Sequence, residues 1–114
     1  MVNKWDIYYC SLNPTQGSEQ RGTRPVIVVS NDAVNHNITV STVIPLSSYK
    51  VGSKTYPTEV FLDMKKTLLP KDSLAMLQQI RTVDHRRLIK KIANISDDDI
   101  RQEISQALKD YFEL

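Results

Sequence analysis

The chain has 114 residues, of which 40% are hydrophobic and 25% charged, and its formal net charge is +2 at pH 7. This length fits one domain over residues 1–114, and the composition is that of a folded globular protein rather than a disordered or fibrous one. No apolar run approaches the roughly 18 residues of a membrane span, and the single Cys10 excludes an intramolecular disulfide framework, so we expect a cytoplasmic protein.

Strand patterns fill the first half of the chain. Residues 6–12 (DIYYCSL) are rich in β-favouring side chains and end at an Asn-Pro stop. Residues 25–30 (PVIVVS) form a continuous, mainly β-branched run that is typical of a buried central strand. Residues 38–46 alternate apolar side chains with Thr and Ser, which predicts a strand with one face in water.

The second half begins with a polar loop and continues with shorter strand patterns. The loop covers residues 47–57 and leads to a strand at 58–63. Residues 72–83 also fit helical spacing, but the surrounding strands favour a strand here. A short turn at 84–88 and a last strand at 89–95 complete the series.

The C-terminal residues 96–114 give the clearest helix signal. Ser96, with Asp99 three residues later, resembles a capping box, and acidic residues fill the first turn. One apolar face recurs at helical spacing and consists of Ile100, Ile104, Ala107, Leu108, Tyr111 and Phe112. Several short strands followed by one helix predict an α+β fold, mainly β, with an antiparallel sheet that curls.

The charges are unevenly distributed along the chain. Residues 96–114 carry six acidic residues against two basic ones, whereas residues 1–95 carry thirteen Lys and Arg against seven acids. A basic body with an acidic tail suits an anionic partner, and it equally suits solubility alone.

The connection between the first two predicted strands concentrates polar and positive chemistry. It includes GSEQRGTRP at residues 17–25 and has about twelve residues, whereas a tight turn needs two to five. Pro25 biases Arg24 toward extended geometry at the start of a strand, where a planar guanidinium can be directed at a phosphate. The residues alone leave phosphate binding and a structural ion pair with Glu19 equally open.

Other polar groups give weaker indications. A basic cluster surrounds Asp84, and such a cluster is more often a solvated face than a track for a phosphate backbone. The cluster consists of Arg81, Arg86, Arg87, Lys90 and Lys91. His36 and His85 lack the spacing of metal ligands, so we expect neither a metal site nor a cofactor.

Two sequence blocks together resemble the MazF/PemK family of toxins from bacterial toxin–antitoxin systems. The first block is GSEQRGTRP at residues 17–25, and the second is QIRTVD at residues 79–84. The similarity runs from residue 5 to the C-terminal helix. It implies a small, curled antiparallel β-barrel of the CcdB/PemK plasmid-toxin type with a C-terminal helix, working as a homodimer.

The resemblance also implies an activity. Members of this family are sequence-specific, metal-independent endoribonucleases that cleave single-stranded RNA or mRNA and thereby inhibit translation and growth. The ribose 2′-hydroxyl is the nucleophile, and the products commonly carry a 2′,3′-cyclic phosphate and a 5′-hydroxyl. The protein must orient the hydroxyl, remove its proton, stabilise the phosphorane and protonate the departing oxygen. An acidic, disordered segment of a cognate antitoxin is expected to occupy the same surface.

By position, the resemblance assigns catalysis to Arg24 and Ser47. Stabilising charge is the physically easier role for an arginine, because its guanidinium does not lose its proton in proteins. Ser47 stands where many relatives have Thr, and Ser48 could compete with it. The resemblance assigns RNA binding to four further residues, Ser18, Glu19, Gln20 and Gln79.

Two departures from the family pattern and two alternatives accompany this interpretation. Trp5 stands where many relatives carry Gly, and residues 75–78 lack an Arg and Asp pair that some PemK-type members use, so the acid and base stay unassigned.

A CcdB-like toxin that binds gyrase is the main alternative. Such toxins resemble one another in acting through a C-terminal Trp-Gly-Ile sequence, whereas this chain ends in Glu113-Leu114. A catalytically inactive dimer that only binds antitoxin is the other alternative.

Overall fold

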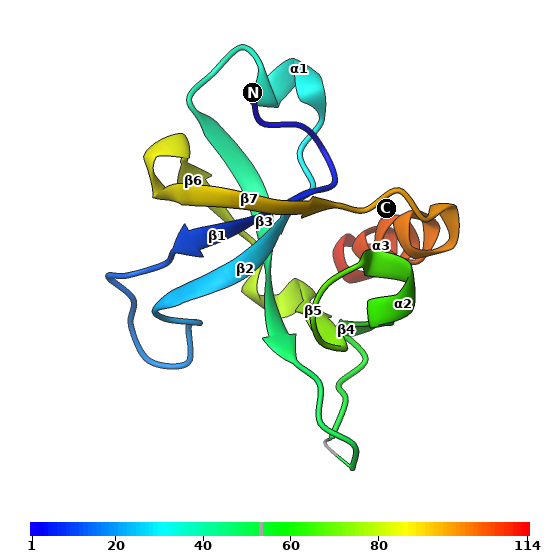
Figure 1. Ribbon diagram of the computed structural model, residues 1–114. Coiled ribbons are helices and arrows are strands. Elements are labelled where there is room, and N and C mark those ends of the chain that lie inside the picture. Colours follow the sequence, from blue (N-terminus) through cyan, green and yellow to red (C-terminus); the bar gives the residue numbers. More distant parts are fainter. Residues whose placement is uncertain (53) are drawn as a thin grey trace.

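The computed structural model describes residues 1–52 and 54–114 and consists of a curved antiparallel sheet with a helix at its C-terminal end (Figure 1). Its strands are β1 (Asp6–Ser11), β2 (Thr23–Val28), β3 (Val40–Ser48), β4 (Glu59–Leu62), β5 (Ser73–Met76), β6 (Arg81–Asp84) and β7 (Leu88–Asn94). Its helices are α1 (Asp32–Asn35), α2 (Met64–Thr67) and α3 (Asp98–Phe112), with 3₁₀ turns η1 (Leu77–Gln79) and η2 (His85–Arg87). Ser53, in the predicted polar loop, lies outside the described residues. Across the described residues, the helices are too short or too polar to span a lipid bilayer.

Strand β3 organises the sheet because it pairs with three neighbours. β2 lies along one side of it, while β6 pairs with residues 40–43 and β5 with residues 46–48 on the other side. The strand order is β4-β5-β3-β2-β1-β7, with β6 also on β3. Because two strands share successive parts of β3, the sheet turns along its length. The curled, mainly β fold with a C-terminal helix is thus confirmed, and the sheet curls without closing into a complete barrel.

The core lies on both faces of the sheet, and β2 contributes to each. Val26 and Val28 belong to a cluster on one face, whereas Ile27 belongs to the larger cluster on the other. The predicted burial of the PVIVVS run is confirmed for these three residues. Ile100 and Ile104 of α3 pack into the larger cluster, and burying each side chain contributes roughly 1.5–3 kcal/mol.

The structure corrects the predicted strand over residues 72–83. Two strands, β5 and β6, are separated there by the 3₁₀ turn η1, and Leu77 is buried within that turn. The extra turn shifts the apolar positions out of strand alternation, which produced the mixed pattern in the sequence. The one-turn helices α1 and α2 were not predicted, because four residues are too few to show helical periodicity.

The cap of α3 also differs from the prediction. Asp97, not Ser96, is the N-cap residue, and its Oδ1 accepts a hydrogen bond from the backbone N–H of Ile100 at 3.0 Å. The capping motif is therefore shifted by one residue. Either residue type can cap a helix, so the sequence did not distinguish them.

Trp5 occupies a backbone conformation that explains why glycine is favoured at this position. Its φ is 75°, in the left-handed region that costs a residue with a large side chain about 1–3 kcal/mol. The indole ring is buried, with Lys4 Nζ 5.1 Å and Arg101 Cζ 5.7 Å from its centroid. Burial of the ring and these cation–π contacts offset the backbone strain.

We expect Asp97→Ala to lower the free energy of unfolding by about 1 kcal/mol, because the Ile100 N–H then loses its cap. Ser96→Ala is the matched control and should change the stability by less than about 0.5 kcal/mol. Urea denaturation of the two variants measures both values. Equal losses, or a larger loss for Ser96→Ala, would show that the cap assignment is wrong.

The buried Cys10 thiol makes the stability of the protein depend on pH. Burial raises the pKa of this thiol, although the nearby Arg81 and Arg87 guanidinium groups oppose the shift. As the pH rises, the thiol loses its proton in the unfolded chain before it does so in the folded chain. The stability that the folded protein has with a protonated, buried thiol is therefore present at lower pH and is lost through the alkaline range.

Wild type should therefore lose more stability than Cys10→Ala between pH 8 and pH 10, by at most about 1.4 kcal/mol per pH unit. Urea titrations at several pH values compare the two proteins. Parallel pH profiles would contradict the prediction.

Candidate active site

The long connection between β1 and β2, residues 12–22 and hereafter the β1–β2 loop, is held by Arg81 of the QIRTVD block and Arg87 of η2. Arg81 Nη1 donates a hydrogen bond to the carbonyl oxygen of Leu12 at 3.0 Å. Arg87 Nη1 donates to the carbonyl oxygens of Ser11, at 3.2 Å, and Asn13. These cationic donors satisfy successive carbonyls where β1 ends, and hydrogen bonds of this kind are stronger than neutral ones.

The far side of the same loop is held by the amide of Gln79. Its Oε1 accepts from the backbone N–H of Gln20 at 3.1 Å, and its Nε2 donates to the carbonyl oxygen of Ser18 at 3.0 Å. One side chain therefore pairs with the loop as a neighbouring strand would. Gly17 and Gly22 supply the two positive φ angles, 54° and 80°, that the loop needs to turn back.

Asp84 supports this arrangement through η2. Its carboxylate caps the turn by accepting from the N–H of Arg86, and the Arg86 side chain also bonds to it. The Arg86 guanidinium holds the pKa of the Asp84 carboxyl below its usual range. The prediction of a solvated basic face is wrong for Arg81 and Arg87, which are half-buried and bonded to the β1–β2 loop.

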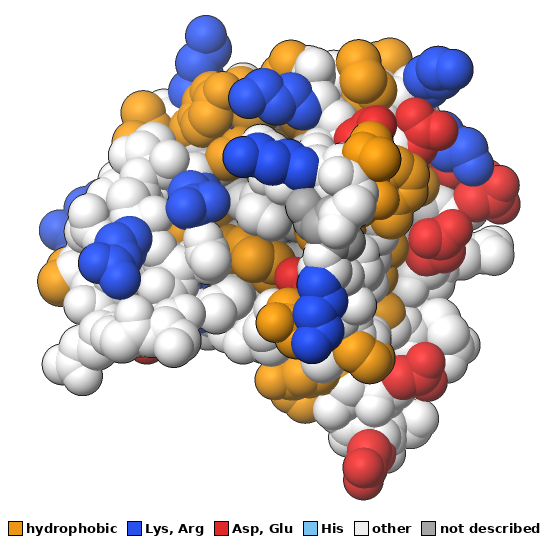
Figure 2. Space-filling model, turned by 90° about the horizontal axis from the view of Figure 1, so that it is seen from below, with side chains coloured by type: hydrophobic (Ala, Val, Ile, Leu, Met, Phe, Trp, Pro, Cys, Tyr) orange, Lys and Arg blue, Asp and Glu red, His pale blue; other side chains and the backbone are white. Residues whose placement is uncertain are grey.

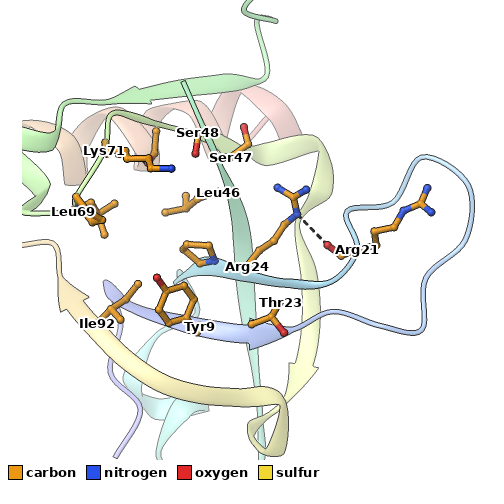
Figure 3. A pocket seen from close by; sticks show the side chains of 13 residues that line it. Tyr9, Arg21, Thr23, Arg24, Leu46, Ser47, Ser48, Leu69, Lys71 and Ile92 are labelled. Carbon is orange, nitrogen blue, oxygen red and sulfur yellow. Dashed lines mark hydrogen bonds between the residues drawn. The ribbon is translucent and has the colours of Figure 1, made fainter. Parts of the chain in front are cut away.

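A cavity of about 350 Å³ opens beside the end of this loop (Figure 3). Arg24 enters it from β2, Ser47 and Ser48 from the end of β3, and Lys71 from the segment before β5. Its apolar lining includes Pro25, Leu46, Leu69 and Ile92, and Tyr9 of β1 completes the lower wall in the view of Figure 3. The combination of cations, hydroxyls and apolar surface suits a phosphate attached to a flat, less polar group.

Arg24 is fixed at one end and open at the other. Its Nε donates to the carbonyl oxygen of Arg21 at 3.0 Å, which directs the rest of the guanidinium toward the cavity (Figure 3). The alternative ion pair with Glu19 is not formed within the described residues. Glu19 Oε1 instead accepts from the backbone N–H of Gln16 at 2.7 Å and closes a turn within the β1–β2 loop.

The remaining predicted residues gather at a second hollow of about 250 Å³. Glu19, Gln20 and Gln79 line it, together with Gln78, Ile80, Arg81 and Pro45. Gln20 Oε1 is buried there without a hydrogen-bond partner among the described residues. Ser18 is exposed and contributes its carbonyl oxygen to the Gln79 contact. The six predicted site residues thus fall into two groups, with Arg24 and Ser47 in the first cavity and the other four around the second hollow.

Lys71 lines the first cavity and was not predicted from the sequence. No local pattern marks it, because Arg24 and Lys71 meet only through the pairing of β3 with both β2 and β5. The two histidines lie elsewhere: His85 Nε2 is 2.8 Å from Ser41 Oγ, and His36 Nε2 is 2.8 Å from Asn3 Oδ1.

The charged side chains are unevenly distributed over the face shown in Figure 2. On the face shown in Figure 2, Lys and Arg side chains lie around a central hollow, and acidic side chains gather mainly along one margin. Among the described residues that line the first cavity, the charged ones are Arg21, Arg24 and Lys71, and all are cations. An anionic ligand is therefore favoured there.

Comparison with known proteins is consistent with these features. A family model described as "PemK-like, MazF-like toxin of type II toxin-antitoxin system" matches residues 3–112. The chain belongs to this toxin family. It is 34% identical over 109 residues to a protein of Bacillus subtilis named Endoribonuclease EndoA, covering 96% of this chain and 92% of that one.

Solved structures of the family share the fold. A MazF from Deinococcus radiodurans superimposes with a TM-score of 0.82 at 24% identity, covering 99% of this chain and 97% of that one. A mycobacterial endoribonuclease, solved in complex with its cognate antitoxin, gives a TM-score of 0.80 at 20% identity, covering 100% and 97%. The curled sheet with its C-terminal helix is therefore common to this chain and these proteins.

We expect Arg87→Ala to loosen the β1–β2 loop, because two carbonyl oxygens lose a cationic donor. The free energy of unfolding should fall by about 1–3 kcal/mol. Backbone amides of residues 12–22 should also exchange faster with solvent, as measured by hydrogen–deuterium exchange.

Arg86→Ala is the matched control, since Arg86 makes only an exposed ion pair with Asp84. Its effect on stability should be much smaller than that of Arg87→Ala, because an exposed ion pair contributes little. Unchanged exchange of the β1–β2 loop in Arg87→Ala would rule out the anchoring role.

Proposed function

We propose that this chain is the toxin of a type II toxin–antitoxin system and acts as a sequence-specific, metal-independent endoribonuclease on single-stranded RNA. The observation that carries the proposal is that Arg24 and Ser47, both from sequence positions typical of the family's catalytic residues, line one cationic cavity. The relative named Endoribonuclease EndoA supports the same reaction class.

In the proposed reaction the ribose 2′-hydroxyl attacks the adjacent phosphorus. The free end of the Arg24 guanidinium binds the non-bridging phosphate oxygens and stabilises the negative charge that grows on them. The hydroxyl of Ser47, which is half-buried at the end of β3, hydrogen-bonds to the attacking ribose and orients it for in-line displacement. The products carry a 2′,3′-cyclic phosphate and a 5′-hydroxyl.

Sequence preference would come from the second hollow. Ser18, Glu19, Gln20 and Gln79 present carboxylate, amide and backbone groups that can bond to exposed base edges of single-stranded RNA. The unpaired Gln20 Oε1 supports this assignment, because a buried acceptor without a donor is costly unless a ligand supplies one. Cleavage chemistry on β2 and β3 and base recognition around the β1–β2 loop would then use neighbouring parts of the molecule.

The proposed working form is a cytoplasmic homodimer controlled by an antitoxin. Exposed apolar side chains support a second subunit, among them Tyr56, Phe61, Tyr111 and Phe112. An acidic, disordered antitoxin segment would bind the cationic face and block access of RNA. The mycobacterial relative solved with its cognate antitoxin supports this form of control.

We expect Arg24→Ala to reduce RNA cleavage by about 10²–10³-fold, because the phosphorane loses its main cationic donor. The measurement uses purified protein in EDTA and a long single-stranded RNA, with the cut ends mapped and their chemistry determined. Wild type should cut at one short motif and leave cyclic phosphates and 5′-hydroxyls.

Arg86→Ala serves as the control arginine and should cleave like wild type, since Arg86 lies outside both hollows. Full activity of folded Arg24→Ala would refute the catalytic assignment. Gyrase-dependent DNA damage with intact RNA would instead favour a CcdB-like toxin. Intact RNA without such damage would favour a dimer that only binds antitoxin.

A further inference from the structure

The proposed reaction needs a proton donor that Arg24 does not provide. The bond between phosphorus and the 5′-oxygen breaks with its electron pair on oxygen, and a bare alkoxide is a poor leaving group at neutral pH. Arginine keeps its proton in proteins, so Arg24 can stabilise charge but cannot protonate the leaving oxygen. A separate acid must therefore reach the scissile bond.

The lining of the first cavity restricts the choice of acid. The lining residues described in the structure include no carboxylate, histidine or cysteine. The titratable ones are Tyr9, Arg21, Arg24 and Lys71. With the arginines set aside, Tyr9 and Lys71 remain as groups that can release a proton.

Lys71 sits on a well-anchored segment between α2 and β5. The preceding Leu69 is buried in the main core cluster, and the backbone carbonyl of Asp72 accepts from the N–H of Tyr49 at 2.9 Å. Ser73 Oγ donates to the Lys71 carbonyl oxygen at 3.2 Å. The backbone of Lys71 is thus held on both sides, which fixes the point from which its exposed side chain reaches the cavity.

The ammonium of Lys71 is available to a ligand. Within the described residues it has neither an acidic partner nor a hydrogen-bond acceptor. In the view of Figure 3, Lys71 and Arg24 approach from opposite sides, with Ser47 and Ser48 between them. In-line displacement separates the attacking and the leaving oxygens, so the leaving oxygen needs a group other than Ser47, which orients the attacking ribose.

We propose that Lys71 is a catalytic residue of this cavity and the general acid that protonates the departing 5′-oxygen, a role that rests on the proposed ribonuclease function. The 2′-oxygen forms a bond to phosphorus and releases its proton to solvent. The P–O5′ bond breaks, and the Lys71 ammonium gives a proton to O5′. The neutral amine that results then takes a proton from water.

Tyr9 is the less suitable donor. It belongs to β1, where it pairs in register with Pro25, and its phenol lies on the lower wall in Figure 3, away from Ser47. A neutral phenol also brings no positive charge to the phosphorane. An ammonium both stabilises the negative charge of the phosphorane and donates the proton.

The test uses two short RNAs that contain the cleavage motif mapped for wild type. One has the normal 5′-oxygen at the scissile phosphate, and the other has sulfur in its place, which leaves as a thiolate without needing a proton. Lys71→Met removes both charge and proton, Lys71→Arg keeps the charge alone, and Lys66→Met on α2 is the matched control. Single-turnover rates are measured after circular dichroism has shown that each variant is folded.

Lys71→Met and Lys71→Arg should both cleave the oxygen substrate about 10²–10⁴-fold more slowly than wild type and Lys66→Met. On the sulfur substrate Lys71→Arg should approach the wild-type rate, whereas Lys71→Met, which also lacks the charge, should recover only part of its loss. A Lys71→Arg variant with full activity on oxygen, an equal loss on both substrates, or the same rescue pattern in Tyr9→Phe instead would overturn the proposal. An inactive wild type would overturn the proposed function itself, whereas an active Lys71→Met beside an active wild type would overturn only the role of Lys71.

Discussion

The geometry of the candidate site depends on the hydrogen bonds that hold the β1–β2 loop. An eleven-residue connection between two paired strands has no strand partner of its own, so its carbonyl and N–H groups need other donors and acceptors. Arg81 and Arg87 satisfy the carbonyls at its start, and Gln79 satisfies one N–H and one carbonyl farther along. All three come from the short stretch 79–87, so the QIRTVD block and the η2 turn that follows it anchor the loop just before Arg24 of β2.

The second constraint is the sharing of β3 between neighbours. Its first half pairs with β6 and its last residues with β5, while β2 runs along the other side. This arrangement brings the end of β3, with Ser47, next to the start of β2, with Arg24. It also brings the segment that carries Lys71 to the same place. The cavity is therefore a consequence of strand pairing, and its three chemical groups come from three separate parts of the chain.

Much of the fold and part of the site could be predicted from the sequence, and the reasons for the remainder are physical. The β-branched run of β2 and the apolar face of α3 are strong local signals, and the GSEQRGTRP and QIRTVD blocks identify the family. Residues 72–83 were misassigned because the three-residue turn η1 interrupts the strand without leaving a glycine or proline. Lys71 could not be found, since its neighbourhood is created by tertiary pairing alone. The positive φ of Trp5 likewise has no local cause in the sequence and depends on the packing of its ring.

The two hollows lie close together along the sheet and share the stretch of chain between Gln20 and Arg24. Pro45 of β3 lines the second hollow, and the next residues of the same strand, Leu46 and Ser47, line the first, so the two sites adjoin along β3. The chain passes from one to the other, with Gln20 of the β1–β2 loop at the second hollow and Arg24 of β2 at the first. In the proposed enzyme, a base bound at Gln20 and a phosphate bound at Arg24 would be held by the same short stretch of backbone. Recognition and cleavage are then coupled through the rigidity of that stretch, because any displacement of the loop at its anchors moves both groups together.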